Sequence, residues 1–266
     1  MSDIISLIIL AIVQGIAEWV PISSSSQIAI VSNLIGHDSS LFVEVALHFG
    51  TLMAVFIYFS KDIMDILRDI LSGKWKTDNA KLGFALIIAA IPAGIFGFFL
   101  KDFISGMGSN FRLMALGLLI TSMLLFIGSV APKKDEKINY WKALLIGCVQ
   151  ILSLFRGISR SGSTISSGLL LGLNEKNAVK FSFLLSIPII LGANLLTIGN
   201  QVLPASLFIG TFVSFLVGIS TIHFSFKYIL SDRKNLRCFA LFVLLEAIAI
   251  WILMVIQVEF TSLKKK

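Results

Sequence analysis

Two polar segments lie inside an otherwise apolar chain, and both carry residue types that can bind or transfer phosphate. The first reads QGIAEWVPISSSSQ and covers residues 14–27. Its Gln14 and Glu18 are four positions apart and share one face of a helix, where they could hold a divalent cation or orient a nucleophile. The run from Ser23 to Ser26 supplies hydroxyl groups as candidates for that nucleophile.

The second segment, FRGISRSGST at residues 155–164, has the composition of an anion receptor. Arg160 is followed by Gly162, which lets backbone amides approach a ligand closely, and it is surrounded by hydroxyl side chains. These are Ser159, Ser161, Ser163 and Thr164. A guanidinium, hydroxyls and amides at a helix N-terminus form a phosphate site. The alternative is that Glu18 and Arg160 form a buried ion pair that only holds the two segments together.

The composition places both segments in a membrane protein. Of 266 residues, 56% are hydrophobic and 14% are charged, whereas soluble domains carry about a quarter charged residues. Six windows reach the roughly 18 residues that cross a bilayer. They are residues 42–59, 82–100, 113–131, 181–199, 202–226 and 238–258. The net charge of +7 therefore indicates lipid headgroups rather than nucleic acid as the partner. Cys148 and Cys238, each in an apolar run, indicate neither a disulfide nor a metal framework.

The apolar runs beside each polar segment are too short to cross a bilayer alone. Residues 4–13 and 28–35 flank the first segment, and residues 143–154 and 165–173 flank the second. Irregular backbone at membrane depth must face protein or water, so each polar break predicts a re-entrant helical hairpin.

The two segments also resemble each other. At an offset of 136 residues, Gln14 meets Gln150 and Ser23 meets Ser159. Each hairpin is followed by three spans, and an odd number of crossings inverts the second copy. We therefore predict one all-α polytopic membrane domain over residues 1–266, with six transmembrane helices, two re-entrant hairpins and an inverted-topology repeat. Its two halves are residues 1–131 and 137–266.

The basic residues favour the same layout. If both hairpins return to the side they entered from, fifteen Lys and Arg lie on one face, including the longest polar connection, residues 61–81. The other face holds five, which are Lys101, Arg112, Lys264, Lys265 and Lys266. The positive-inside rule then places a multi-pass protein in the cell membrane with both termini outside. The two remaining basic residues, Arg156 and Arg160, belong to the second polar segment.

The chain resembles the integral-membrane undecaprenyl-diphosphate phosphatases, the bacitracin-resistance family. QGIAEWVPISSS and GISRSGSTI are similar to its two signatures, and VALHFGTLMAV, IPAGIFG and SFLLSIPIILGA read like further family segments. The resemblance implies hydrolysis of a polyprenyl diphosphate to the monophosphate on the outer face, with Mg²⁺ or Ca²⁺, which recycles the lipid carrier of cell-wall glycans. It also implies six transmembrane helices and two re-entrant hairpins. The expected partners are the lipid and the bilayer, and a homodimer is possible.

Carried over by position, the resemblance assigns roles to particular residues. Glu18 and Gln14 become the metal-binding or acid–base pair, and Ser24 becomes the nucleophile. Ser25 joins the phosphate-binding residues of the second segment, which are Ser159, Arg160, Ser161 and Thr164.

The chain departs from the family pattern at three positions. Ser26 and Gln27 stand where the family usually has Gly-His, and Arg156 stands where it usually has Pro. Gln27 cannot accept a proton as His can, so it can only orient the nucleophile or a water. The chain is similar at this position to archaeal-like members of the family that also carry Gln, and this similarity implies a dolichyl-type lipid as an alternative substrate. His48, four residues after Glu44, is an alternative base at the mouth of the site. A polyprenyl-phosphate binding protein or transporter without hydrolysis is the alternative function.

Overall fold

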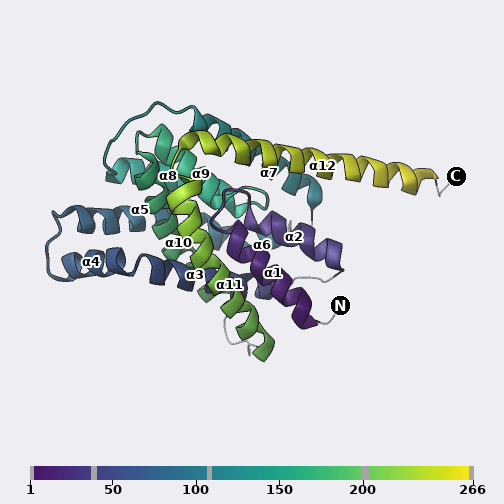
Figure 1. The fold of residues 1–266 in the computed structure, drawn as a ribbon, viewed down its shortest axis with the longest axis horizontal. Helices are drawn as coiled ribbons and strands as arrows, with labels where there is room; N and C mark the ends of the chain where they lie inside the picture. Colours follow the sequence, from purple (N-terminus) through teal and green to yellow (C-terminus); the bar gives the residue numbers. More distant parts are fainter. Residues whose placement is uncertain (1–2, 37–40, 107–109, 199–203, 264–266) are drawn as a thin grey trace.

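The computed structural model describes residues 3–36, 41–106, 110–198 and 204–263 (Figure 1). Every regular element within these residues is helical, which confirms the predicted all-α class. The first half contains α1 (Asp3–Ala17), α2 (Ser24–Ile35), α3 (Leu41–Tyr58), α4 (Ser60–Leu71), α5 (Asp78–Phe99), α6 (Lys101–Gly106) and α7 (Phe111–Ser129). The second half contains α8 (Tyr140–Gln150), η1 (Ile151–Leu154), α9 (Arg160–Leu170), α10 (Glu175–Ile198), α11 (Ala205–Phe224), η2 (Ser225–Ile229), η3 (Arg233–Asn235) and α12 (Leu236–Leu263).

The membrane-spanning windows coincide with long helices. Among the described residues, α5, α7, α10, α11 and α12 are long and apolar enough to cross a bilayer. The sixth window is α3, which passes the same test together with α4 although the pair is bent by 74°. The multi-pass character predicted from the sequence is therefore confirmed. Residues 199–203, at the edges of two windows, lie outside the described part of the chain.

Helix α4 is a difference from the sequence analysis, which treated residues 61–81 as a polar connection. Isoleucines recur along one side of this segment at helical spacing, between charged residues. Helix α4 lies beside α5 (Figure 1), and its Ile66 and Ile70 fill the space next to Gly83. The charged face explains why hydropathy alone identified a loop.

Two helix–break–helix units lie within this bundle. The apolar helices Ile4–Ala17 and Tyr140–Leu154 are shorter than a membrane span, as predicted. Helix α1 packs against α2 after the first break, and α8 packs against α9 after the second. Helix α9 is almost entirely buried, including its hydroxyl side chains. The two breaks are therefore enclosed by protein.

The long helices pack in pairs that position both breaks. Helix α1 packs on α11, α8 packs on α5, and α3 contacts both α10 and α11. Helices α7 and α12 run side by side (Figure 1). Trp19, in the first break, is fully buried and meets the ring of Phe183 on α10 at 4.9 Å between centroids. This contact ties the first break to the centre of the second half.

Candidate active site

The first break ends in a backbone turn that sets the start of α2. Ser23 has φ of 68°, a left-handed conformation that is uncommon outside glycine. Its carbonyl oxygen accepts hydrogen bonds from the amides of Ser26 and Gln27, at 3.1 and 3.2 Å. Ser24 is consequently the first residue of α2, and Glu18 follows directly after α1.

The second break is fixed by α7. Thr121 Oγ1 donates to the carbonyl oxygen of Gly157 at 2.8 Å and accepts from the amide of Ser159 at 2.9 Å. Gly157 has φ of 98°, and a Cβ there would lie 2.2 Å from the carbonyl oxygen of Met114. Ser159 caps α9 by accepting from the amide of Gly162 at 3.1 Å. These contacts fix Arg160 as the first residue of α9.

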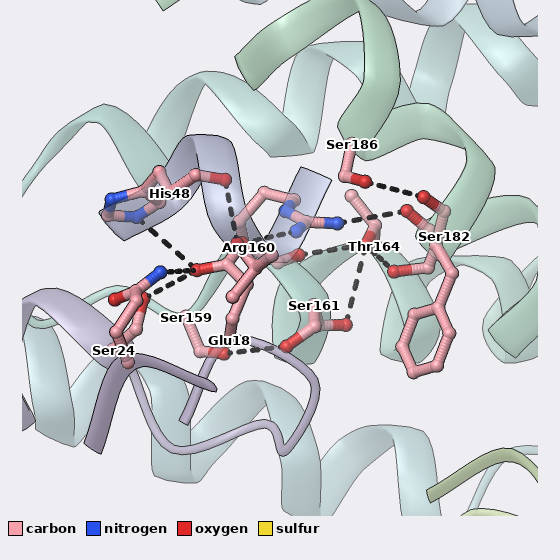
Figure 2. Close-up of polar contacts among 12 residues, drawn as sticks. Glu18, Ser24, His48, Ser159, Arg160, Ser161, Thr164, Ser182 and Ser186 are labelled. Carbon is pink, nitrogen blue, oxygen red and sulfur yellow. Dashed lines mark hydrogen bonds and ion pairs between the residues drawn. The ribbon is translucent and has the colours of Figure 1, made fainter. Parts of the chain in front are cut away.

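The two breaks meet at an ion pair between Glu18 and Arg160 (Figure 2). Arg160 Nη2 donates to Glu18 Oε1 at 2.6 Å. Glu18 Oε2 accepts from Ser24 Oγ at 2.8 Å and from Gln14 Nε2 at 3.1 Å, and His48 Nε2 lies 3.3 Å from it. The Glu18 side chain is only 6% exposed. A hydroxyl, a carboxylate and a guanidinium are thus in direct contact, and the Glu18–Arg160 ion pair is the one that the sequence analysis gave as the alternative to a phosphate site.

Residues of α9 and α10 surround Arg160. Its Nη1 donates to the carbonyl oxygen of Ser182 at 3.0 Å, and its Cζ lies 5.7 Å from the centre of the Trp19 ring. Thr164 Oγ1 is 2.7 Å from Ser182 Oγ. Ser161 Oγ lies 3.3 Å from the Oγ of Ser159. The four predicted phosphate-binding residues of the second segment are therefore close together (Figure 2). Ser182 was not singled out from the sequence, although it contacts Arg160 through its backbone carbonyl and Thr164 through its hydroxyl.

The hydrogen-bond contacts of Gln27 and Ser25 are with residues other than Glu18 and Arg160. Gln27 Nε2 donates to Glu246 Oε1 on α12 at 2.7 Å. Glu246 is the lone acid of the last span, and its second oxygen is buried without a hydrogen-bond partner. The Oγ of Ser25 lies 3.4 Å from the Oγ of Ser23. The structure thus links Gln27 to α12 rather than showing it hydrogen-bonded to the Glu18 carboxylate.

A second ion pair lies beside the first. Arg156 Nη2 donates to both carboxylate oxygens of Glu44, at 2.8 and 2.9 Å. Glu44 also contributes its backbone carbonyl oxygen, 2.7 Å from His48 Nδ1. The spacing of Glu44 and His48 indicated a shared helical face, but no local signal paired Glu44 with Arg156, 112 residues away.

The side chains around Glu18 do not by themselves offer a full set of ligands for a resident divalent cation. Within the described residues, no group of three or more His, Cys, Asp or Glu side chains could hold a metal. Both oxygens of Glu18 already face donors, including a guanidinium. Gln14 directs its amide nitrogen to Glu18, and its buried oxygen has no hydrogen-bond partner. A hard cation would therefore need further oxygen ligands, from water or from a bound phosphate.

The fold and site together define a class: a multi-pass helical membrane protein whose two interrupted helix pairs enclose a hydroxyl–carboxylate–guanidinium cluster. The chain belongs to the family described as Bacitracin resistance protein BacA, which matches residues 7–249.

Three curated relatives agree with this assignment. An undecaprenyl-diphosphatase of Caldicellulosiruptor bescii is 41% identical over 82% of this chain and 85% of its own length. Undecaprenyl-diphosphatase 1 of Pseudoalteromonas translucida is 36% identical over 93% of this chain and 97% of its own. An undecaprenyl-diphosphatase of Methanosphaera stadtmanae is 39% identical over 74% and 78%, respectively. The predicted family is confirmed.

Proposed function

We propose that this protein is a membrane phosphatase that hydrolyses a polyprenyl diphosphate, of undecaprenyl or dolichyl type, to the monophosphate and inorganic phosphate. The observation that carries the proposal is the direct contact of Ser24 Oγ and Arg160 Nη2 with opposite oxygens of Glu18. The names of the relatives, all undecaprenyl-diphosphatases, support the same substrate class. The physiological role would be to recycle the lipid carrier of cell-envelope glycans.

In the proposed reaction, Ser24 Oγ or a water held at its position attacks the terminal phosphorus of the diphosphate. Glu18 Oε2, 2.8 Å from Ser24 Oγ, accepts the proton of the nucleophile. The bond from the terminal phosphorus to the bridging oxygen breaks, and its electron pair stays on that oxygen, giving the polyprenyl monophosphate. When Ser24 attacks, a water then cleaves the phosphoserine and releases phosphate.

Arg160 supplies the charge that this reaction needs. As phosphate arrives, its guanidinium would release the Glu18 oxygen and form a fork with two phosphate oxygens. Ser159, Ser161 and Thr164 would donate hydroxyls to the same group, and Ser25 would do so from the first break. Gln27 would act through its amide oxygen, because its amide nitrogen donates to Glu246.

The expected Mg²⁺ or Ca²⁺ remains part of the proposal as a companion of the diphosphate. Gln14 and Glu18 are its predicted protein ligands, and they would offer too few oxygens without the lipid. Calorimetric titration of the purified protein should therefore give weak binding of either cation alone, and tighter binding after a non-hydrolysable diphosphonate is added. Equal affinity in both conditions would contradict this order of binding.

The proposed architecture is an inverted repeat of residues 1–131 and 137–266, with two re-entrant hairpins and a site open to the outer face. Support comes from the packing of α1 on α11 and of α8 on α5. These pairs correspond to each other if α1 matches α8 and α5 matches α11. Both termini would lie outside the cell membrane, although residues 1–2 and 264–266 themselves are outside the described part of the chain.

The decisive experiment is phosphate release from undecaprenyl diphosphate by the purified protein in detergent, with Mg²⁺ or Ca²⁺. Ser24→Ala should reduce turnover at least about tenfold, because water must then replace the positioned hydroxyl. Glu136→Gln, at an exposed acid paired with Lys142, is the matched control and should leave turnover unchanged. A wild-type protein that binds the lipid but releases no phosphate would overturn the proposal in favour of binding or transport.

A further inference from the structure

The pair between Glu44 and Arg156 repeats the chemistry of the central pair. In both, an arginine from the second break donates to a buried carboxylate from the first half of the chain. The Glu44 side chain is 7% exposed and that of Glu18 is 6% exposed. Burying two charges is costly unless they are paired, so each arginine rests on a carboxylate in the absence of a ligand.

The two pairs lie next to each other along α3. Glu44 and His48 are four residues apart on this helix, about one turn of 5.4 Å. His48 Nε2 faces Glu18 Oε2 at 3.3 Å, while its Nδ1 faces the backbone carbonyl of Glu44. His48 thus connects the two ion pairs.

The two arginines differ in how much of their side chains is exposed. The side chains of Arg156 and His48 are 25% and 24% exposed, whereas that of Arg160 is 12% exposed. Arg156 is therefore the more exposed of the two arginines, whereas the more buried Arg160 shares the carboxylate of Glu18 with Ser24. A diphosphate that reaches Ser24 with its terminal phosphate leaves its other phosphate, the one attached to the lipid, on the Arg156 side.

We propose that Arg156 binds the lipid-attached phosphate of the substrate, with Glu44 holding its guanidinium in place until the lipid arrives. This inference rests on the proposed phosphatase function and adds a second anion-binding residue to it. Arg156 would then select a diphosphate over a monophosphate, since only a diphosphate reaches both arginines at once.

The same contact would assist the reaction. As the bond to the terminal phosphorus breaks, negative charge builds on the bridging oxygen of the departing polyprenyl monophosphate. A guanidinium at that phosphate stabilises this charge through charge-assisted hydrogen bonds. No proton has to be supplied by Arg156, because a phosphate leaving group carries the charge itself.

The competing explanation is that Arg156 and Glu44 are only a strut between the second break and α3. Three variants separate the two ideas: Arg156→Gln, Glu44→Gln, and the double variant, which removes both charges and leaves no unpaired buried ion. Arg233→Gln is the matched control, because Arg233 is also buried and ion-paired, to Glu175 at 2.7 Å, between other elements.

Two measurements are needed on each purified variant. The first is KM and kcat for undecaprenyl diphosphate, together with the melting temperature. The second is the equilibrium affinity for a polyprenyl methylenediphosphonate and for the corresponding monophosphonate, which requires no turnover. If the wild type hydrolyses nothing, the proposed function fails, while the affinity measurement still tests Arg156.

A phosphate-binding Arg156 predicts a specific pattern. Arg156→Gln and the double variant should raise KM about tenfold, the effect of losing one charge-assisted hydrogen bond, and should weaken diphosphonate affinity far more than monophosphonate affinity. Glu44→Gln should leave KM unchanged or lower, because it releases the guanidinium. Arg233→Gln should lower only the melting temperature. Equal KM for Arg156→Gln and Glu44→Gln, or equal losses of affinity for both phosphonates, would establish the strut and overturn the proposal.

Discussion

At the scale of single residues, Glu18 is the centre of the polar cluster formed by the two breaks. Its carboxylate faces an amide, a hydroxyl, an imidazole and a guanidinium that come from four separate places in the sequence. An ionised carboxylate only accepts hydrogen bonds, so the amide of Gln14, the hydroxyl of Ser24 and the guanidinium of Arg160 act as donors to it, and the His48 ring lies within ion-pair distance. The arrangement fits both a strut and a catalytic pair, and changes that conserve shape distinguish them.

We expect Glu18→Gln and Arg160→Lys each to reduce turnover by about a hundredfold while the protein stays folded. Glu18→Gln keeps the shape but cannot take a proton, and Arg160→Lys keeps the charge but loses the fork that fits phosphate. Phosphate release and size-exclusion chromatography in detergent measure the two effects. Wild-type turnover in both variants would mean that the pair has only a structural role.

Gln27 makes a different prediction because its amide nitrogen is bound by Glu246. Gln27→Leu should destabilise the protein by about 1–3 kcal/mol, since it leaves the partly buried carboxyl of Glu246 without its donor. Gln27→Leu combined with Glu246→Leu should recover most of this loss. Thermal unfolding in detergent gives the stabilities, and phosphate release on the same samples shows whether activity recovers with them.

If the double variant is stable but slow, Gln27 acts on the reaction itself, as predicted from its position in the first segment. If stability and turnover recover together, Gln27 serves to anchor α2 to α12. A Gln27→Leu variant as stable as the wild type would show that the hydrogen bond to Glu246 contributes nothing measurable.

At the scale of elements, the two backbone turns hold the site. Ser23 is the single non-glycine residue with positive φ in the described part of the chain. It determines where α2 begins and hence where Ser24 lies. The serine run predicted hydroxyl chemistry, but it did not predict this conformation, because a left-handed residue is selected by the surrounding packing and not by serine itself.

We expect Ser23→Gly to be more stable than Ser23→Ala by about 1 kcal/mol, the reverse of the usual order in helices. Both variants remove the hydroxyl, so their difference reports the backbone conformation alone. Melting temperatures in detergent measure it. The opposite order, with alanine more stable, would be incompatible with φ of 68° at this position.

At the scale of the whole molecule, the predicted topology can be tested on exposed sites. After Cys148 and Cys238 are replaced by Ser, single cysteines at Ser72 and Lys133 should resist an impermeant reagent in intact cells. A cysteine at Asp102 should react, because the positive-inside rule places residues 61–81 inside. Labelling of Ser72 with protection of Asp102 would reverse the orientation, and labelling of all three would exclude the inverted repeat.

The sequence predicted the long spans and both polar breaks because hydropathy and residue type are local properties. It also predicted that Arg160 and Glu18 belong to one site, since both interrupt apolar runs. It did not predict α4, whose charged face hides its isoleucines from a hydropathy average. Nor did it predict the partners of Arg156 and Gln27, because Glu44 and Glu246 lie on other helices and only tertiary packing brings them together.

The guanidinium of Arg160 is already paired with Glu18, and this pairing has a consequence for product release. If Arg160 binds phosphate as proposed, Glu18 competes with that phosphate for the guanidinium, and phosphate binding gains only the difference between two similar interactions. After cleavage, the polyprenyl monophosphate and inorganic phosphate are no longer joined. Each would then compete separately with the carboxylate of Glu18 or Glu44 for an arginine. Product inhibition by inorganic phosphate should therefore be weak, because the carboxylates that pair with the two arginines would also displace the products.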